Sequence, residues 1–355
     1  MQPATSISSC REATIETLLA PIGEKRFLSG IRSLHALFCL YASTSPEPLP
    51  ARGLIITPEI RAQCERYLPI AKITTIFNRL YSSALTYPPI LSSTPFHSSF
   101  SWADTFASLP YEFQFSANPA RLLEALLCDK DLMTRFLFTS FLPKRFYGAI
   151  GRYPDQQLFI REWLKARGTG RVSCLDAACG TGEETYKLAN LLCELGFSPD
   201  NMRIDGWTVE PLEVWVATHR SLPHDRNREA LLRETAAPLL QRGYGRSIHF
   251  RCIDLIRGAP YACSPDMSAV NGGQFNLILC NGLLGGPIIN ENSQLEQAVA
   301  NLVQLLAPGG MMLAADNFHG GWKQKCPQWK LRASFEANGL RNVEISEGIC
   351  GLKPY

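Results

Sequence analysis

The stretch from residue 172 to residue 189, VSCLDAACGTGEETYKLA, constrains the fold of this chain more than any other. Its apolar beginning ends at Asp176, a Gly-Thr-Gly turn follows, and a helix-forming run starts at Glu183. This order predicts a strand, a tight turn and a helix N-terminus in series. Gly180 and Gly182 allow a ligand to approach the backbone, because glycine has no Cβ and adopts positive φ at little cost. The first N–H groups of the helix can then bind an anionic group such as a carboxylate.

Dinucleotide-binding enzymes also carry glycines at this place, in the order G-x-G-x-x-G. Here the third glycine is missing, and Glu183 and Glu184 stand where a pyrophosphate would approach. The two carboxylates would repel a pyrophosphate, whereas a zwitterionic ligand with one carboxylate tolerates them better. The turn therefore disfavours a nicotinamide oxidoreductase. The plainer alternative is an ordinary strand-to-helix turn that binds nothing.

The same strand, turn and helix resemble motif I of the class I S-adenosylmethionine (AdoMet) methyltransferases. The resemblance implies that AdoMet is the cofactor. It also implies that the cofactor contacts the turn and the residues beside it, namely Asp176, Ala178, Gly180, Gly182 and Glu183.

Strands and helices alternate along the second part of the chain, which predicts an α/β fold with a doubly wound, mostly parallel sheet. Seven strands are expected, at residues 172–176, 204–209, 247–252, 275–280, 311–315, 341–346 and 348–353, with a turn at 307–310. The first part of the chain has helical spacing instead, including one long helix over 58–85. We expect a helical N-terminal domain over 1–148 and an AdoMet-binding domain with the Rossmann-like methyltransferase fold over 149–355.

Polar residues follow four of the expected strands, at the edge where an open α/β sheet binds its ligands. These residues are Asp176, Glu210, Asp254 and Asn281. The Glu210 carboxylate can accept hydrogen bonds from both ribose hydroxyls, or it can cap the next helix. Asp254 and Leu255 suit an adenine amine and ring, or Asp254 simply forms a loop turn. Asn281 can reach the methionine part of the cofactor or the acceptor, or it serves as a turn residue before a glycine.

Three segments carry a more specific resemblance, GTGEETYKLA at 180–189, FNLILCNGLL at 275–284 and DNF at 316–318. They are similar to motifs of the chemotaxis-receptor glutamate methyltransferases, which implies cofactor contacts from Glu183, Glu210, Asp254 and Leu255. Two positions depart from that family, since Gly286 stands where it has a tyrosine and Arg152 is out of register with its arginine. Residues 221–246 are short and helical, where the receptor-docking members carry a small β-subdomain. The resemblance thus supports the cofactor more than it supports a receptor as acceptor.

Methyl transfer from a sulfonium is an in-line displacement, in which the enzyme mainly places a nucleophile close to the methyl group. A carboxylate acceptor needs no base, whereas a hydroxyl, phenol or amine usually does. The candidate catalytic residues on the acceptor side are Arg152, Tyr153, Asn317 and His319. For Arg152 the alternative is a surface residue at the domain joint, and for His319 it is a solvated loop residue.

Composition and charge disfavour several other classes of protein. The net charge is only +3 in 355 residues, which disfavours electrostatic binding of nucleic acid. The basic segment 226–242 could dock an acidic partner, although a solvated amphipathic helix is the favoured interpretation. Twelve cysteines show no C-x-x-C pair and no Cys/His metal spacing, so we expect free thiols and no metal. No apolar run predicts a membrane span, and we expect a cytoplasmic protein without a membrane partner.

The favoured hypothesis is an AdoMet-dependent methyltransferase that modifies a carboxylate or hydroxyl of a small molecule or a protein. Its partners would be AdoMet and a methyl acceptor; the sequence assigns neither that acceptor nor an oligomeric state. The alternative from another class is an AdoMet-binding regulatory module with reduced catalysis. Gly286 and the unmatched Arg152 motivate this alternative.

Overall fold

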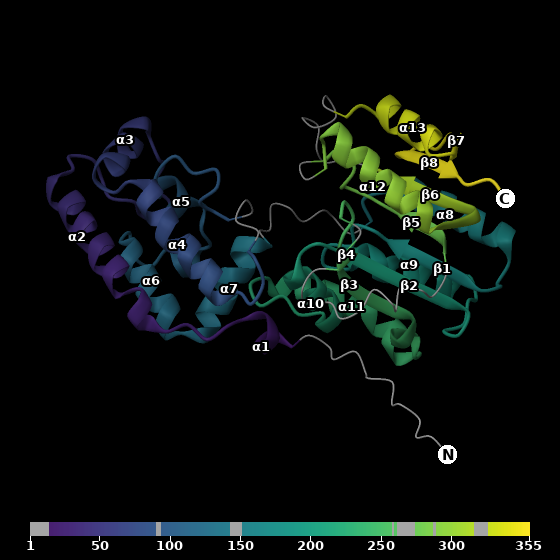
Figure 1. Ribbon diagram of the computed structural model, residues 1–355. Coiled ribbons are helices and arrows are strands. Elements are labelled where there is room, and N and C mark those ends of the chain that lie inside the picture. Colours follow the sequence, from purple (N-terminus) through teal and green to yellow (C-terminus); the bar gives the residue numbers. More distant parts are fainter. Residues whose placement is uncertain are drawn as a thin grey trace, which may run out of the picture. The chain divides into compact units, whose positions relative to one another are not determined.

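The computed structural model describes residues 14–89, 94–142, 151–257, 259–260, 274–286, 289–315 and 326–355. The chain divides into two compact units. A helical unit comprises Ala13–Tyr147 together with Leu222–Asp225, and a sheet unit includes Gly148–Ser221 and Arg226–Tyr355. Most of the helical unit is coloured purple to blue in Figure 1, and the sheet unit is coloured teal to yellow.

The helical unit contains α1 (Ile15–Leu18), α2 (Leu28–Thr44), α3 (Pro58–Tyr67), α4 (Ile70–Ala84), α5 (Trp102–Ser108), α6 (Pro119–Cys128) and α7 (Lys130–Phe141). The single helix expected over 58–85 is wrong, because Pro69 divides it into α3 and α4. Proline has no N–H and disfavours helical geometry in the residue before it, and Leu68 leaves the helix with φ −130° and ψ 71°. The Glu65 carboxylate then accepts the Ile70 N–H at 2.8 Å, which satisfies a donor at the start of α4.

Aromatic side chains form much of the core of the helical unit. Tyr81 of α4 stacks on Phe136 of α7, with 6.0 Å between ring centroids and 5° between the ring planes. The Tyr81 hydroxyl lies 2.9 Å from the Ser140 hydroxyl. Ser140 donates its own proton to the Phe136 carbonyl, so Tyr81 is the donor to Ser140. Both hydroxyls are buried and both have partners, as buried polar groups normally do.

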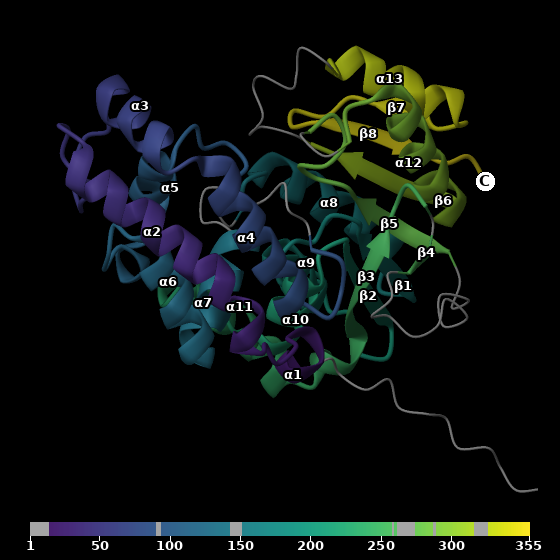
Figure 2. The ribbon, with the colours of Figure 1, turned by 60° about the vertical axis from the view of Figure 1, so that its left-hand side comes forward.

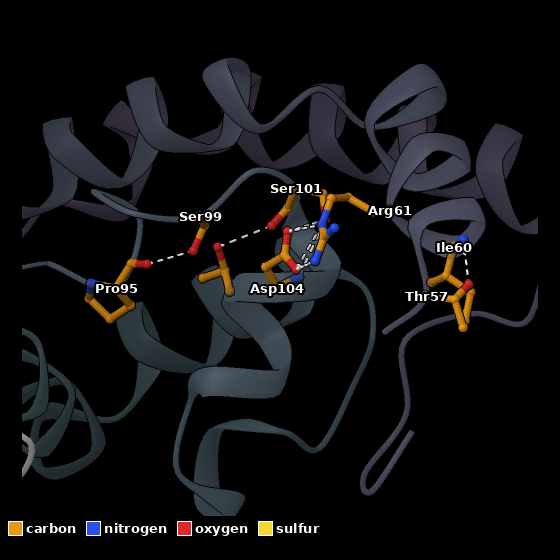
Figure 3. A network of polar contacts seen from close by, with 8 residues as sticks. Thr57, Ile60, Arg61, Pro95, Ser99, Ser101 and Asp104 are labelled. Atoms are coloured by element: carbon orange, nitrogen blue, oxygen red, sulfur yellow. Dashed lines mark hydrogen bonds and ion pairs between the residues drawn. The ribbon is translucent and has the colours of Figure 1, made fainter. Parts of the chain in front are cut away.

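An ion pair joins α3 to α5 within the helical unit (Figure 3). The Arg61 guanidinium donates to both oxygens of Asp104, at 2.9 and 3.0 Å. Ser101 donates to the same carboxylate at 3.0 Å and accepts the Asp104 N–H at 3.3 Å, which caps α5. Burial alone would raise the pKa of Asp104, but the hydrogen bonds from Arg61 and Ser101 outweigh it and lower the pKa.

The sheet unit is built on one eight-stranded sheet with the order β4-β3-β2-β1-β5-β6-β8-β7 (Figure 2). In chain order the strands are β1 (Val172–Asp176), β2 (Met202–Thr208), β3 (Ile248–Asp254), β4 (Ala259–Pro260), β5 (Phe275–Leu279), β6 (Leu306–Ala314), β7 (Arg341–Val343) and β8 (Ile349–Leu352). From β3 to β6 all neighbours are parallel, whereas β4, β7 and β8 pair antiparallel. The doubly wound, mostly parallel sheet is confirmed, and the short edge strand β4 adds to the seven strands expected.

The central strand β1 lies between β2 and β5. The chain runs outward from β1 to β2 and β3, and then returns to β5 on the other side of β1. The strand order therefore reverses at β1, and an open α/β sheet forms its ligand crevice at the carboxyl ends of the strands beside such a reversal. The sequence places the glycine turn directly after β1, at this point.

The α-helices of the sheet unit within the described ranges are α8 (Pro154–Arg167), α9 (Glu183–Glu194), α10 (Pro211–His219), α11 (Arg226–Gln241), α12 (Asn292–Leu305) and α13 (Gln328–Ala337). The turn expected at 307–310 is wrong, because these residues lie within β6. Gly309 adopts φ +68°, and its N–H donates to the Lys353 carbonyl at 3.0 Å. The pairing of β6 with β5 shifts register between Phe275 and Leu277. Residues 307–310 therefore bulge between two paired positions of β6, and the hydrogen bonds to Lys353 hold the Pro-Gly-Gly run on the other side.

No helix within the described ranges has the length and apolar character needed to cross a membrane.

Candidate functional site

The strand, turn and helix expected at residues 172–189 are present. Asp176 ends β1, Gly180 and Gly182 adopt φ of +51° and +89°, and Glu183 begins α9. A Cβ on Gly182 would lie 2.9 Å from the Ala217 Cβ, so close packing as well as backbone geometry requires glycine there. A Cβ on Gly180 would meet only the Glu213 Oε1, at 4.0 Å, which is an ordinary contact distance. The backbone at Gly180 therefore has the open side that a ligand needs.

Asp176 is 3% exposed and accepts a hydrogen bond from the Thr185 hydroxyl at 2.7 Å. Burial raises the pKa of its carboxyl to about 6, and the neighbouring Glu184 carboxylate adds to the shift. The Thr185 hydrogen bond and the charge of Arg152 act in the opposite direction. Asp176 thus anchors the end of β1 to Thr185, which directly follows the twin glutamates in the first turn of α9.

The twin glutamates have different partners. The Glu183 carboxylate is 8% exposed and forms an ion pair with Arg228 of α11 at 2.6 Å. Its other oxygen accepts the Thr181 hydroxyl proton at 2.6 Å. Glu184 accepts the N–H of Gly151 at 2.9 Å. The structure therefore ties both carboxylates to residues of the protein.

Arg152 and Tyr153, the two described residues of the acceptor side, lie next to the carboxyl end of the sheet. The Arg152 guanidinium lies over the Tyr153 ring, 5.8 Å from its centroid, and its charge acts on Asp176. Tyr153 is 1% exposed, and its hydroxyl donates to the carbonyl of Ala315, one residue beyond β6, at 3.3 Å. The other two candidates, Asn317 and His319, lie outside the described residues.

Glu210 lies two residues after the end of β2 and is 5% exposed. Its Oε1 accepts the N–H of Leu212 at 3.0 Å, which caps α10. The helix-cap alternative is therefore realised in this structure. Because a carboxylate has several acceptor sites, the cap leaves the expected ribose contact as a prediction.

Asp254 ends β3 and forms the loop turn that was the alternative to an adenine contact. Its Oδ1 accepts the N–H groups of Ile256 and Arg257, at 2.9 and 3.3 Å, and Arg257 forms an ion pair with it at 3.6 Å. Leu255 is 7% exposed and belongs to the core cluster that also contains Trp207. The adenine contact of Asp254 and Leu255 stays a prediction.

Asn281 follows β5 and pairs with Gln156 of α8 through two amide hydrogen bonds, of 2.7 and 3.2 Å. Its Oδ1 also accepts the Ala315 N–H at 2.9 Å. The Asn281 side chain therefore joins α8, β5 and the end of β6. Gln156 is 1% exposed and was not singled out by the sequence, because its partner is 125 residues away.

Glu213 is a further carboxylate at the glycine turn that the sequence reasoning missed. It is the nearest side chain to the open side of Gly180, and the Thr208 hydroxyl at the end of β2 donates to it. Burial raises the pKa of Glu213 to about 7, and the nearby Glu183 charge adds to the shift. The signal was available, because Glu213 lies in the first turn of α10, three residues after the N-cap Glu210.

The cysteines at the site are buried thiols. Burial raises the pKa values of Cys179 and Cys280 well above the ordinary value, and the Asp176 charge adds to both shifts. Both thiols therefore stay protonated near neutral pH and are poor nucleophiles. No disulfide joins the ten cysteines within the described ranges, and no cluster suited to a metal ion occurs there.

Gly286, where the chemotaxis-receptor family has a tyrosine, has little room for a side chain. A Cβ on Gly286 would lie 3.1 Å from the carbonyl oxygen of Gly282 and 3.2 Å from that of Leu283. These distances are shorter than ordinary contacts, so a tyrosine would require the backbone to shift. The glycine is therefore built into the loop after β5.

No protein-family model matches the sequence, and neither does any curated protein sequence. Among solved structures, the chain is similar to the N-methyltransferase NodS from Bradyrhizobium japonicum in complex with S-adenosylhomocysteine, at 17% identity over 66% of this chain and 98% of NodS, with a TM-score of 0.36. It is also similar to an O-methyltransferase part of StiE, at 16% identity over 59% of this chain and 56% of that one, with a TM-score of 0.35. For the [4+2]-cyclase SpnF the values are 21% identity, 56% and 63% coverage, and a TM-score of 0.33. The chain thus spans less than two thirds of the StiE and SpnF chains.

Proposed function

We propose that this protein binds AdoMet at the carboxyl ends of β1, β2, β3 and β5, and transfers its methyl group to an acceptor. One observation carries the proposal. The Gly180 turn, with its open side, joins the central strand to the N-terminus of α9, where the strand order reverses. Such a turn suits the carboxylate of an amino-acid ligand.

The carboxylates around the crevice support AdoMet over a dinucleotide. Asp176, Glu210 and Glu213 lie at the carboxyl ends of β1 and β2 or in the helix that follows β2. AdoMet carries a sulfonium, which carboxylates attract, whereas they repel a pyrophosphate. We propose that Glu210 accepts the ribose hydroxyls and that Asp254 and Leu255 contact the adenine. The Asn281 backbone would face the methionine part, because its side chain is engaged with Gln156.

Bound AdoMet would supply an electrophilic methyl group, and transfer would form a bond from an acceptor oxygen to carbon as the sulfur–carbon bond breaks. Tyr153 would not serve as the base, because its hydroxyl is buried and donates to the Ala315 carbonyl. We therefore propose a carboxylate acceptor before a hydroxyl, on a small molecule or a protein. Arg152, next to the twin-glutamate turn, is the proposed partner of that carboxylate.

The motif resemblance to the chemotaxis-receptor methyltransferases also favours a carboxylate acceptor. A receptor glutamate is a weaker candidate, because Gly286 has little room for the tyrosine of that family and α11 stands where that family has its β-subdomain. The same tight glycine favours a second candidate function, an AdoMet-binding regulatory module with reduced catalysis.

Incubation of the protein with AdoMet labelled in the methyl group, together with cell extract, separates the two functions. Label that appears in a small-molecule or protein fraction, and is lost with Gly180→Asp, supports methyl transfer. Base-labile label points to a carboxylate ester, and base-stable label points to an ether or amine. Tight AdoMet binding without transfer to any fraction supports the regulatory module instead.

A further inference from the structure

The ion pair between Arg228 and Glu183 links helix α11 to the glycine turn. The Arg228 Nε donates to Glu183 Oε1 at 2.6 Å, and the two side chains are 17% and 8% exposed. Thr181 donates to the other carboxylate oxygen at 2.6 Å. Both oxygens of Glu183 are therefore held by the protein, one by the turn itself and one by α11.

Arg228 belongs to the buried face of α11. Leu232, Ala236 and Leu239 follow it at helical spacing and are at most 1% exposed. The Asn190 amide of α9 donates to the Thr235 carbonyl of α11 at 3.0 Å, which fixes the two helices side by side. Segment 226–242 is therefore an amphipathic helix, as expected, and Arg228 lies on its buried face rather than on its solvated one. Arg233 on the same helix is 58% exposed and pairs with Glu229.

The position of Glu183 creates an electrostatic conflict that Arg228 resolves. The N-terminus of α9 attracts an anion through its N–H groups, but Glu183 and Glu184 occupy the first turn. An unpaired carboxylate there would repel the carboxylate of an amino-acid ligand. Arg228 neutralises Glu183, and Gly151 holds Glu184 through its N–H. The helix terminus then keeps its attraction for an anion.

We propose that Arg228 is a positioning residue for the cofactor site, which compensates the Glu183 charge so that the N-terminus of α9 can bind the amino-acid carboxylate of the cofactor. This inference rests on the proposed function. It also changes the expected role of Glu183, which holds the turn rather than contacting the ligand.

A pair of ligands tests the proposal in the full-length protein. S-adenosylhomocysteine has the amino-acid carboxylate, whereas 5′-methylthioadenosine has the same adenine and ribose without it. Calorimetric titration of Arg228→Met should show affinity for S-adenosylhomocysteine weakened by about ten-fold, the order expected for one charge interaction in a partly solvated cleft. The affinity for 5′-methylthioadenosine should stay within about two-fold of the wild type, because it has no carboxylate to repel. Equal weakening for the two ligands, or none, would overturn the proposal.

Further variants separate charge from folding. The double variant Arg228→Met/Glu183→Gln should recover most of the lost affinity, since it removes both charges, and Arg228→Lys should retain it. Arg233→Met, on the exposed face of α11, is the matched control and should change neither affinity. If Arg228→Met does not fold, Glu183→Gln tests the inference instead. This variant should not weaken the affinity for S-adenosylhomocysteine relative to the affinity for 5′-methylthioadenosine. A selective loss in Glu183→Gln would make Glu183 a ligand contact and overturn the inference.

Ligand binding by the wild-type protein distinguishes a failure of the proposed function from a failure of the inference about Arg228. A folded wild-type protein that binds neither AdoMet nor S-adenosylhomocysteine contradicts the proposed function, and the inference with it. A wild type that binds S-adenosylhomocysteine, with an Arg228→Met variant that shows the same ratio of the two affinities, contradicts the inference alone.

Discussion

Gln156 and Asn281 exchange two amide hydrogen bonds, of 2.7 and 3.2 Å, between α8 and the end of β5. The pair lies near the crevice, because Asn281 also accepts the N–H of Ala315, the residue that follows β6. A reciprocal amide pair has a defined direction, because each side chain offers one donor and one acceptor to the other. It therefore fixes the loop after β5, where the methionine part of the cofactor is expected.

Gln156→Leu should destabilise the protein, because it leaves the Asn281 amide without its buried partner. The expected loss is about 1 kcal/mol in the free energy of unfolding, because Asn281 is half-buried and water can replace part of the lost hydrogen bonding. Denaturant unfolding measures the loss. The double variant Gln156→Leu/Asn281→Leu should lose less than the sum of the two single variants. Additive losses would show that the pair is not energetically coupled.

Gly180→Ala and Gly182→Ala should separate binding from folding. An alanine at Gly182 would need φ +89° and would approach the Ala217 Cβ to 2.9 Å, so we expect a loss of about 2–3 kcal/mol of stability. Gly180 is open on its Cβ side, so its alanine variant should lose only about 1 kcal/mol, from the positive φ. The added methyl should still weaken AdoMet strongly. Thermal unfolding and calorimetry on both variants test the contrast, and a Gly180→Ala protein that binds AdoMet normally would place the ligand elsewhere.

Glu213 gives the stability of the protein a characteristic dependence on pH. Burial raises the pKa of its carboxyl from the ordinary 4.5 to about 7, so between these values the folded state binds more protons than the unfolded state. The free energy of unfolding should therefore decrease as pH rises across this window. Glu213→Gln removes the titrating group, and its stability relative to the wild type should increase from pH 5 to pH 8. A constant difference across that range would mean that Glu213 is charged throughout.

Tyr81→Phe tests the core of the helical unit independently of the cofactor site. The variant removes the hydroxyl that donates to Ser140 at 2.9 Å, while Ser140 keeps its own bond to the Phe136 carbonyl. The expected loss is about 1 kcal/mol, because Ser140 loses only an acceptor interaction. AdoMet affinity should be unchanged. Ser140→Ala should cost more than Tyr81→Phe, since it leaves the buried Tyr81 hydroxyl without an acceptor.

The local pattern of the sequence predicted the doubly wound sheet and the strand, turn and helix around Gly180. These features depend on residues close in the chain, such as the apolar run before Asp176 and the glycines after it. The break at Pro69 was readable from the same local rules. The irregular strand at 307–310 was not, because Pro and Gly are turn residues by composition, and this run is held only by the pairing of its neighbours in β6 and by hydrogen bonds to the distant Lys353.

Side-chain partners of the site were predicted least well. Arg228 pairs with Glu183 across 45 residues and Gln156 pairs with Asn281 across 125, and a single sequence carries no signal for such contacts. The expected ligand residues Glu210 and Asp254 both form local backbone turns as well. At the site, the spacing of Glu213 from Glu210 was an overlooked signal that the sequence did contain.

Calorimetric titration of the intact protein with AdoMet, S-adenosylhomocysteine and NADH tests AdoMet binding most directly. We expect one site per chain for AdoMet and for S-adenosylhomocysteine, no binding of NADH, and loss of both bound ligands in Gly180→Asp. A folded wild-type protein that binds neither AdoMet nor S-adenosylhomocysteine, or that binds NADH in their place, would contradict the assignment of the crevice after β1.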